Sequence, residues 1–257
     1  MDSDLWRRTG LAHSKTRAYR RSLDSAKRIF DRGIARGRMV VSTSWGKDSV
    51  VMGDIALSLG IKDFLHLESP YELPGNEQVI SHFATLADVT ILPAEKTIEE
   101  YVSWYQDIGL AHCRTKAAHS KVVQQIKKSR GTQWCLDHGY EVQALGMRAK
   151  EHGGREDMIK ALGAVIQSKR TGLWRCMPIA YWSNEDVWAH IAANDLPYNR
   201  RIYDAETHGL TRYTIRNLGW ISTDGAHKNG RIGWLRDHFR AQFDQLVSAF
   251  PDVRLLE

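Results

Sequence analysis

The feature that most constrains the fold is an alternation of short apolar runs with segments of helical periodicity in the first part of the chain. Residues 38–44 form an apolar, β-branched run that leads directly into Trp45 and Gly46. Further strand patterns follow at 63–69 and 89–93, and helical patterns at 50–59, 77–86 and 97–105. Parallel strands need helical crossovers between them, so this alternation predicts an α/β fold with a doubly wound, mainly parallel sheet.

The rest of the chain predicts appendages to one main domain, because no Pro/Gly/Ser-rich linker divides it. Additional elements are expected as helices at 14–35, 184–193 (capped by Ser183) and 235–250, and a strand at 142–147. We therefore expect a basic helical arm at 1–37, a main domain at 38–204, and a C-terminal loop and helix appendage at 205–257. Residues 205–234 are glycine-rich, and both a lid and an ordinary surface loop fit them.

Composition excludes several protein classes. The 257 residues are 42% hydrophobic and 26% charged, unlike disordered, collagen-like or disulfide-scaffold chains. No apolar window is long enough for a membrane span and no secretory leader pattern is present, so we expect a cytoplasmic protein without a membrane partner. The cysteines are too few for a disulfide framework and are expected as buried thiols: Cys113, Cys135 and Cys176. The histidines show no metal-ligand spacing, so no metal site is predicted.

The positive charge of the chain is concentrated near its start. Residues 1–38 carry 11 Lys and Arg against 4 Asp and Glu, whereas the formal charge of the whole chain is +6. A second run without acids lies at 114–130 and ends in Arg130. Such runs fit either solvated helix faces or surfaces that bind the phosphates of nucleic acid.

The segment with the most chemical information is Ser44-Trp45-Gly46-Lys47-Asp48-Ser49, which follows the first strand. A glycine permits close approach of an anion, a helix N-terminus attracts it, and lysine and serine side chains can bind it. The segment therefore predicts a phosphate cradle, against the alternative of an ordinary helix start with Asp48 or Ser49 as N-cap. It lacks the spacing of a Walker A loop.

This segment resembles the PP-loop of the ATP pyrophosphatases, in the form found in the phosphoadenylyl-sulfate (PAPS) reductase-like branch. Three more segments are similar to motifs of that family in the order the family requires: 67–74, 146–155 and 177–204. The resemblance implies a Rossmann-like, adenine nucleotide alpha hydrolase-like fold. It also implies cleavage of ATP between its α and β phosphates, with ATP and Mg²⁺ as cofactors and AMP passing to an acceptor oxygen.

The resemblance implies roles for individual residues. Lys47 is expected to hold the β and γ phosphates, and Asp48 to cap the helix or position a metal-bound water. Arg148 and Arg155 are expected to face the α phosphate or the acceptor, against the alternative of ion pairs with Glu151 or Glu156. Gly146 is part of the motif or a plain strand-end turn. The expected nucleotide-binding residues are Ser42, Thr43, Ser44, Trp45, Gly46, Lys47, Ser49, Leu67, Glu68, Gly146 and Arg148.

The chain departs from the reductases of this family. Residues 250–257 lack the Glu-Cys-Gly-Leu-His motif that carries the reductive cysteine, and the wide cysteine spacing argues against an iron–sulfur cluster. With the ATP-cleaving motifs retained, the sequence is similar to the ATP pyrophosphatases of DNA phosphorothioation systems. That similarity predicts sulfur incorporation into nucleic acid, with DNA favoured over tRNA, contacted through the basic arm and the 114–130 helix.

Partners and alternatives follow from the same resemblance. The expected sulfur donor is a cysteine desulfurase or another carrier, and both a homodimer and a multi-subunit complex fit. The alternatives are a sulfonucleotide reductase or sulfate adenylyltransferase-like enzyme, a tRNA thiolation enzyme, and a subunit that binds ATP without turnover.

Overall fold

A computed structural model describes residues 4–100, 103, 129–151, 153–216, 231–249, 251 and 253. The chain forms two compact units. Unit 1 comprises residues 1–66, 77–91 and 131–199, and unit 2 comprises residues 67–76, 92–130 and 200–257. The expected cysteine at 113 and almost all of the expected basic helix at 114–130 lie outside the described residues.

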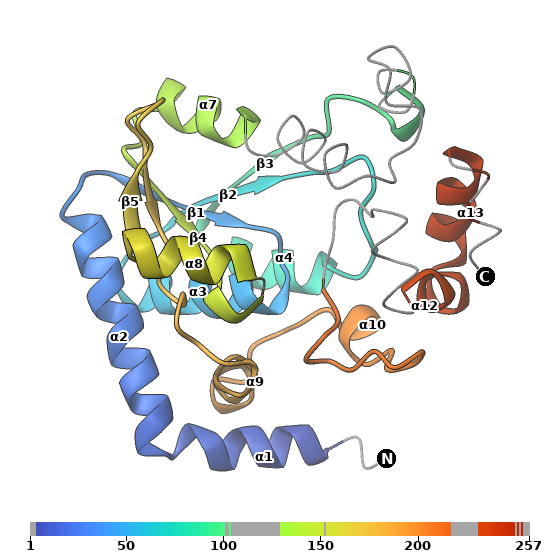
Figure 1. The fold of residues 1–257 in the computed structure, drawn as a ribbon, viewed down its shortest axis with the longest axis horizontal. Helices are drawn as coiled ribbons and strands as arrows, with labels where there is room; N and C mark the ends of the chain where they lie inside the picture. The colour runs from blue at the N-terminus through green and yellow to red at the C-terminus, as the bar shows by residue number, and fades with distance from the viewer. Residues whose placement is uncertain are drawn as a thin grey trace. The chain divides into compact units, whose positions relative to one another are not determined.

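A six-stranded sheet has the order β3-β2-β1-β4-β6-β5 (Figure 1). Its strands are β1 (Met39–Thr43), β2 (Asp63–Leu67), β3 (Asp88–Leu92), β4 (Val142–Leu145), β5 (Val165–Gln167) and β6 (Trp174–Cys176). β1 runs parallel to both β2 and β4, β4 runs parallel to β6, and β5 is antiparallel to β6. The predicted α/β fold with a mainly parallel sheet is confirmed, whereas the short strands β5 and β6 were not predicted.

The sheet order creates a switch point between β1 and β4. From β1 the chain adds β2 and β3 on one side, and it then returns to the other side of β1 to form β4. The two strands pair from Met39 opposite Val142 to Ser42 opposite Leu145, so both end at the same edge. In open α/β sheets, ligands bind outside the carboxyl ends of the strands at such a switch point.

The helices of the first part of the fold confirm most of the predicted pattern. They are α1 (Leu5–Ser14), α2 (Arg17–Ile34), α3 (Lys47–Ser58), α4 (Glu77–Ala84), α7 (Arg130–Asp137), η2 (Ala149–Glu151), α8 (Gly153–Leu162) and α9 (Asn184–Ala193). Ser183 caps α9 as predicted, in a capping box with Asp186. The helix expected at 14–35 is α2, and α1 precedes it.

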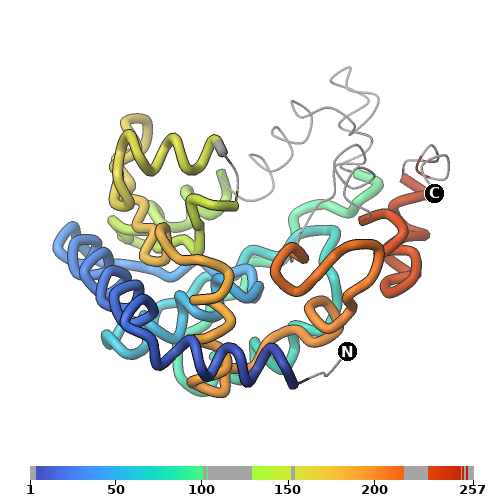
Figure 2. Tube along the Cα trace, turned by 60° about the horizontal axis from the view of Figure 1, so that its bottom comes forward, coloured from blue at the N-terminus to red at the C-terminus, as the bar shows by residue number. Residues whose placement is uncertain are grey.

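The N-terminal arm packs into unit 1. The chain turns between α1 and α2, and α1 lies along α9 (Figure 2). A Cβ at Gly10 would lie 3.1 Å from the Trp188 carbonyl oxygen, so glycine permits this close helix contact. Trp6 completes it by contacting Trp188 edge-on, with ring centroids 5.2 Å apart. The arm is therefore a packed part of this unit.

Unit 2 contains α10 (Arg200–Tyr203), α12 (Arg231–His238) and α13 (Arg240–Ala249). The single terminal helix expected at 235–250 is wrong, because two helices meet at Phe239. The buried Phe239 ring packs on Trp234 at 4.9 Å, and this contact lies at the break. The long loop expected at 205–234 already becomes helical at Arg231, and its central residues 217–230 lie outside the described part.

Buried aromatic residues form much of the core. Trp45, Trp182, Trp188 and Trp234 are each at most 1% exposed, so these four tryptophans are core residues. None of the described helices combines the length and the apolarity needed to cross a membrane.

Candidate nucleotide-binding site

The loop between β1 and α3 presents its backbone at the switch point. Trp45 adopts a left-handed φ of 55°, which is uncommon for a bulky residue. Its side chain is buried against His66 and Phe83, with ring centroids 5.7 and 5.5 Å away. The bulky second residue of the motif thus anchors the loop in the core. Gly46 is the N-cap of α3 and no side chain caps this helix, which leaves its first turn open to an anion.

Two serines hold the loop in shape. Ser49 Oγ donates a hydrogen bond to the Gly46 carbonyl at 2.9 Å and accepts one from the Ser44 amide at 3.3 Å. The Ser44 and Ser49 hydroxyl oxygens lie 3.5 Å apart. Both hydroxyl groups therefore lie beside the start of α3, where the predicted phosphate would bind.

The two residues at the end of β1 have structural partners. Ser42 Oγ accepts a hydrogen bond from the Gln143 side-chain amide of β4 at 2.8 Å. Thr43 Oγ1 accepts one from the Trp45 amide at 3.1 Å. These contacts join β1 to β4 and fix the turn into the loop.

Lys47 begins α3, and its side chain is only 2% exposed. Its Nζ lies 3.0 Å from Asp48 Oδ2. The alternative in which Asp48 or Ser49 is the N-cap is wrong, because the N-cap is Gly46 and Asp48 lies within the first turn of α3. Asp48 instead acts as a counterion for two cations.

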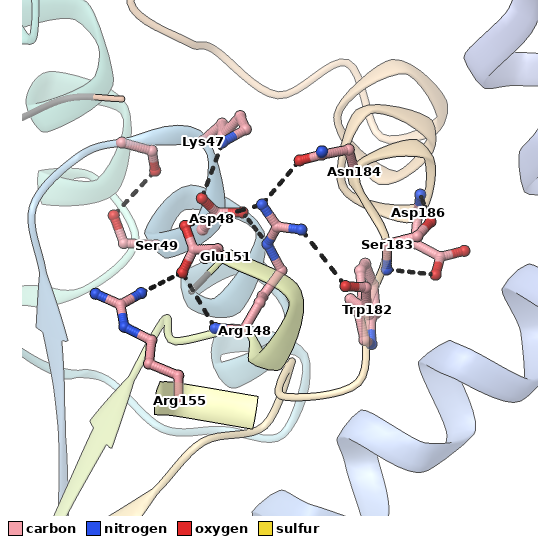
Figure 3. A network of polar contacts seen from close by, with 11 residues as sticks. Lys47, Asp48, Ser49, Arg148, Glu151, Arg155, Trp182, Ser183, Asn184 and Asp186 are labelled. Carbon is pink, nitrogen blue, oxygen red and sulfur yellow. Dashed lines mark hydrogen bonds and ion pairs between the residues drawn. The ribbon is translucent and has the colours of Figure 1, made fainter. Parts of the chain in front are cut away.

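The second cation is Arg148, which is 3% exposed and lies at the centre of a polar network (Figure 3). Its Nε donates to Asp48 Oδ1 at 2.7 Å. Its two terminal nitrogens donate to Asn184 Oδ1 at 2.8 Å and to the Trp182 carbonyl at 3.4 Å. Arg148 therefore ties the loop after β1 to the start of α9.

Glu151 extends the network from the η2 turn. Its carboxylate accepts a hydrogen bond from the Arg148 amide at 3.3 Å and pairs with Arg155 of α8. The Arg155 side chain is 38% exposed, so this guanidinium remains accessible from solvent. Glu156, the other predicted partner, pairs instead with Lys160 at 2.7 Å. Among the described residues, the cations Lys47, Arg148 and Arg155 thus face the carboxylates of Asp48 and Glu151.

Gly146 brings the end of β4 against the start of α3. A Cβ at Gly146 would lie 3.1 Å from the Ser49 amide nitrogen and 3.3 Å from the Asp48 carbonyl carbon. Both neighbours are backbone atoms, which cannot rotate away. The position therefore requires glycine because two backbones approach each other closely there, and not because of a turn.

The other two predicted nucleotide-binding residues belong to unit 2. Leu67 is the last residue of β2, and the amide of Glu68 donates a hydrogen bond to the Leu92 carbonyl at 2.9 Å. The remaining predicted residues, in the loop after β1 and in the segment after β4, gather in unit 1.

Sequence reasoning missed two members of this network. Asn184 and the Trp182 carbonyl both accept hydrogen bonds from Arg148, although they lie 36 and 34 positions away. The nearest sequence signal was Ser183, the helix cap that lies between them. Glu151 was considered only as the partner in a surface ion pair, and the structure places it in the network.

Among the described residues, no group of three or more His, Cys, Asp or Glu side chains could hold a metal ion. Cys135 and Cys176 are buried free thiols, as predicted. Burial raises the pKa of each thiol to about 12, which keeps both neutral at physiological pH.

Comparison with known proteins decides the family. Residues 38–223 match the phosphoadenosine phosphosulfate reductase domain. The chain belongs to this family. The predicted resemblance to the PAPS reductase-like branch is therefore confirmed.

Curated relatives within the PAPS reductase domain family are distant in sequence. The chain is 22% identical over 170 residues to a phosphoadenosine 5'-phosphosulfate reductase of Gloeobacter violaceus, covering 63% of this chain and 64% of the relative. It is 21% identical over 168 residues to an adenosine 5'-phosphosulfate reductase of Staphylococcus haemolyticus, covering 63% of each. The match thus spans somewhat less than two thirds of each relative.

Solved structures agree with this family on the fold. A PAPS reductase from Candida auris in a phosphate complex superposes with a TM-score of 0.51 and 14% identity, over 78% of this chain and 90% of that one. A U34-tRNA thiolase from Methanococcus maripaludis with its [4Fe-4S] cluster gives a TM-score of 0.50 and 13% identity, over 86% and 80% of the chains. At these identities the likeness supports the adenine nucleotide alpha hydrolase-like fold alone.

Proposed function

We propose that the chain binds ATP at the carboxyl ends of β1 and β4 and cleaves it between the α and β phosphates. The observation that carries this proposal is the uncapped first turn of α3 at the switch point, next to the buried Lys47. A helix N-terminus, a glycine at the N-cap and a lysine in the first turn together favour a polyphosphate. The solvent-accessible guanidinium of Arg155, 38% exposed, supports the same ligand.

In the proposed reaction an acceptor oxygen attacks the α phosphorus of ATP, and the bond from this phosphorus to the bridging oxygen breaks. Pyrophosphate leaves with the bond electrons, and AMP remains on the acceptor. Such transfer depends on positioning and charge neutralisation more than on covalent catalysis. Lys47 neutralises the β and γ phosphates, and Ser44 donates a hydrogen bond to a phosphate oxygen. Ser49 would do the same by turning its hydroxyl proton away from the Gly46 carbonyl. Arg155 faces the α phosphate or the acceptor.

Arg148 has a different part in this scheme from Arg155. Its guanidinium already donates to Asp48, Asn184 and the Trp182 carbonyl, and its side chain is almost fully buried. Arg148 therefore positions the loop and α9, and Arg155, which is 38% exposed, supplies a solvent-accessible positive charge. This division refines the expectation that both arginines face the phosphate.

Under this proposal Mg²⁺ would bind together with the nucleotide, as MgATP. Mg²⁺ is commonly held by substrate phosphates, one or two carboxylates and waters. Both oxygens of Asp48 already face cations at 3.0 Å or less, so the phosphates would supply most of the ligands. Asp48 then bonds to metal-bound water more readily than to the metal itself.

We further propose that the adenylated acceptor is a nucleic acid phosphate and that sulfur then replaces the AMP, as in DNA phosphorothioation. A persulfide carried by a cysteine desulfurase or another carrier would attack the activated phosphorus, and AMP would leave with the former phosphate oxygen. A second thiol would then cleave the S–S bond, forming a disulfide with the carrier and leaving the phosphorothioate. Retention of the PP-loop and the positive charge of residues 1–38 support this proposal. DNA is favoured over tRNA.

A second candidate is a sulfonucleotide reductase, which the names of the curated relatives favour. Its substrate would be a small sulfonucleotide, and it would need a reductive thiol. The two described cysteines are buried, and burial raises their pKa to about 12, so neither is suited to that role.

The decisive experiment is to incubate the protein with α-labelled ATP and Mg²⁺ and to separate AMP from ADP. Parallel reactions contain duplex DNA, tRNA, sulfate or no acceptor. AMP and pyrophosphate that increase with duplex DNA would support the proposal, and an increase with tRNA or sulfate would name a different acceptor. ADP as the product would contradict cleavage between the α and β phosphates. ATP binding without any product would favour a non-catalytic subunit.

A further inference from the structure

Helix α2 has one apolar face and one basic face. Its buried residues pack within unit 1: Tyr19, Ala26, Ile29, Phe30 and Gly33. The opposite face is exposed and carries six basic side chains, which we call the α2 basic face: Arg17, Arg20, Arg21, Lys27, Arg28 and Arg32. Only two acidic residues, Asp24 and Asp31, interrupt it. At 1.5 Å per residue the face extends over about 23 Å.

The basic side chains of this face make few polar contacts with the described part of the chain. In the described part of the chain, no ion pair joins any of the six side chains to a carboxylate. Arg20 donates only to the Lys15 carbonyl, at 3.4 Å. Some other exposed bases of unit 1 are paired, such as Arg7 with Asp195 at 2.7 Å and Arg38 with Asp63 at 3.2 Å. An uncompensated row of charge on one helix is a surface for an extended anion.

The basic face is held rigidly. Thr16 caps α2 by accepting a hydrogen bond from the Tyr19 amide at 3.2 Å. On the buried side, the Tyr19 hydroxyl and His190 Nδ1 are 2.7 Å apart, and Ser22 Oγ donates to Asp186 at 3.1 Å. These contacts anchor the helix to α9, so a ligand does not have to order it on binding.

Contacts also connect α2 to the loop after β1. The indole nitrogen of Trp182 donates to the Ser22 carbonyl of α2 at 3.0 Å, and the carbonyl of the same Trp182 accepts from Arg148. Arg148 in turn pairs with Asp48 at the start of α3. The basic helix and the candidate nucleotide site are thus parts of one packed assembly.

We propose that the α2 basic face binds the phosphodiester backbone of a nucleic acid. Clustered, unpaired Lys and Arg side chains bind such a backbone by releasing its counterions, independently of sequence. A membrane surface fits less well, because a helix that binds lipid inserts its apolar face and the apolar face of α2 is buried in protein. That the bound strand is also the acceptor of AMP rests on the proposed function.

The test compares two double variants that each remove two exposed positive charges from unit 1. R21Q/R28Q changes the basic face, and K169Q/R170Q changes two exposed bases elsewhere in the unit. We expect R21Q/R28Q to weaken binding of a labelled 20-base-pair duplex by about tenfold or more at 0.1 M KCl. The slope of log K against log [KCl] should fall by about 2, at roughly 0.9 per lost phosphate contact. K169Q/R170Q should bind like the unmodified protein.

A second double variant increases the positive charge of the same face, so it should have the opposite effect on binding. D24N/D31N removes the two acidic residues and should tighten binding and steepen the salt dependence. Its failure to do so, or equal losses in R21Q/R28Q and K169Q/R170Q, would overturn the proposal. So would tighter binding to vesicles of anionic phospholipid than to nucleic acid. Parallel titrations with tRNA show whether the face binds the phosphodiester backbone of DNA or of RNA more tightly.

The binding assay contains no ATP, so it is independent of the proposed reaction. Loss of binding in R21Q/R28Q together with absence of AMP formation in the unmodified protein would support the surface and contradict the reaction. AMP formation by the unmodified protein together with unchanged binding in R21Q/R28Q would support the reaction and contradict the surface.

Discussion

Arg148 and Asp48 lie one hundred positions apart in the sequence, and their side chains form an ion pair 2.7 Å long beside the first turn of α3. The pair connects the segment after β4 to the loop after β1, across the switch point of the sheet. Because Asp48 also contacts Lys47 at 3.0 Å, one carboxylate sets the positions of both cations. The geometry of the candidate site therefore depends on a contact that is remote in sequence.

Removal of Arg148 should destabilise the protein strongly. The variant R148A removes the donor to Asp48 Oδ1 and to Asn184 Oδ1 and leaves Asp48 with Lys47 alone. The loss of one partner of a buried pair costs about 3–5 kcal/mol. Denaturant unfolding would measure this loss. The control is R7A, which breaks an equally short but exposed pair with Asp195 and should cost less than about 1 kcal/mol. Similar losses in the two variants would contradict a buried, structural Arg148.

Lys47 should matter for turnover more than for folding. In K47A, Asp48 keeps its ion pair with Arg148, so we expect a folded protein that forms no AMP from ATP. The release of pyrophosphate and the far-ultraviolet circular dichroism would be measured together. The control is K160A, which removes an exposed lysine paired with Glu156 and should leave turnover unchanged. Normal turnover in K47A would disprove the role of Lys47 in holding phosphate.

An added methyl group at Gly146 should disturb the site directly. In G146A the new Cβ meets backbone atoms of Ser49 and Asp48 at 3.1–3.3 Å, so the end of β4 and the start of α3 must separate. We expect a loss of about 1–3 kcal/mol in stability and a larger loss of ATP turnover. In G60A the Cβ meets no atom within 4 Å but φ is +80°, so stability should fall by about 1 kcal/mol and turnover should persist. Equal turnover in the two variants would exclude the proposed close approach.

The stability of the protein should fall at high pH, in part through Tyr19. Burial, assisted by Asp54 and Asp186, raises the pKa of Tyr19 from 10.0 to about 12. Between these values the unfolded chain releases the phenol proton and the folded chain retains it, so this contribution is complete below pH 10 and is lost as the pH rises to about 12. The variant Y19F cannot ionise, so its free energy of unfolding should fall less steeply over this range.

The stability of Y19F is first compared with that of the unmodified protein near pH 8, below the range in which Tyr19 ionises. There Y19F lacks the hydroxyl contact with His190 and should be less stable by about 1 kcal/mol. The deficit should shrink as the pH rises from 10 to 12, as followed by urea unfolding. A constant deficit across this range would show that Tyr19 titrates alike in the two states.

Arg231 should be replaceable without loss of stability. It is 7% exposed, and among the described residues its side chain pairs with no carboxylate, donating only to the Arg216 carbonyl at 2.5 Å. Burial lowers its pKa to about 10, which reflects the cost of an uncompensated charge. R231M removes that charge while filling similar space, and should be neutral or stabilising by about 1 kcal/mol or more.

A matched control for Arg231 lies in the same unit. Arg212 is 8% exposed and pairs with Glu206 at 2.9 Å and Asp204 at 3.3 Å. R212M leaves both carboxylates without this partner and should lose about 3 kcal/mol. Thermal unfolding of the two variants would separate them. An equal loss in R231M would contradict the interpretation of Arg231 as an uncompensated charge.

Local pattern alone determined the central part of the fold. Residues 38–59 predict strand, loop and helix because hydrophobic period, β-branching and a glycine turn are all encoded within a few neighbouring positions. The Ser183 cap of α9 was predicted for the same reason, since a capping box spans only four residues. Such signals do not depend on where the rest of the chain lies.

Tertiary structure decided which residues of those elements contact one another. Only the folded chain shows that Arg148 pairs with Asp48 and donates a hydrogen bond to Asn184, and that Gly146 lies against the backbone of Ser49. It also divides the expected terminal helix at Phe239. Ion-pair partners and close backbone approaches are set by distances in space between residues tens of positions apart. No periodicity within the sequence carries those distances.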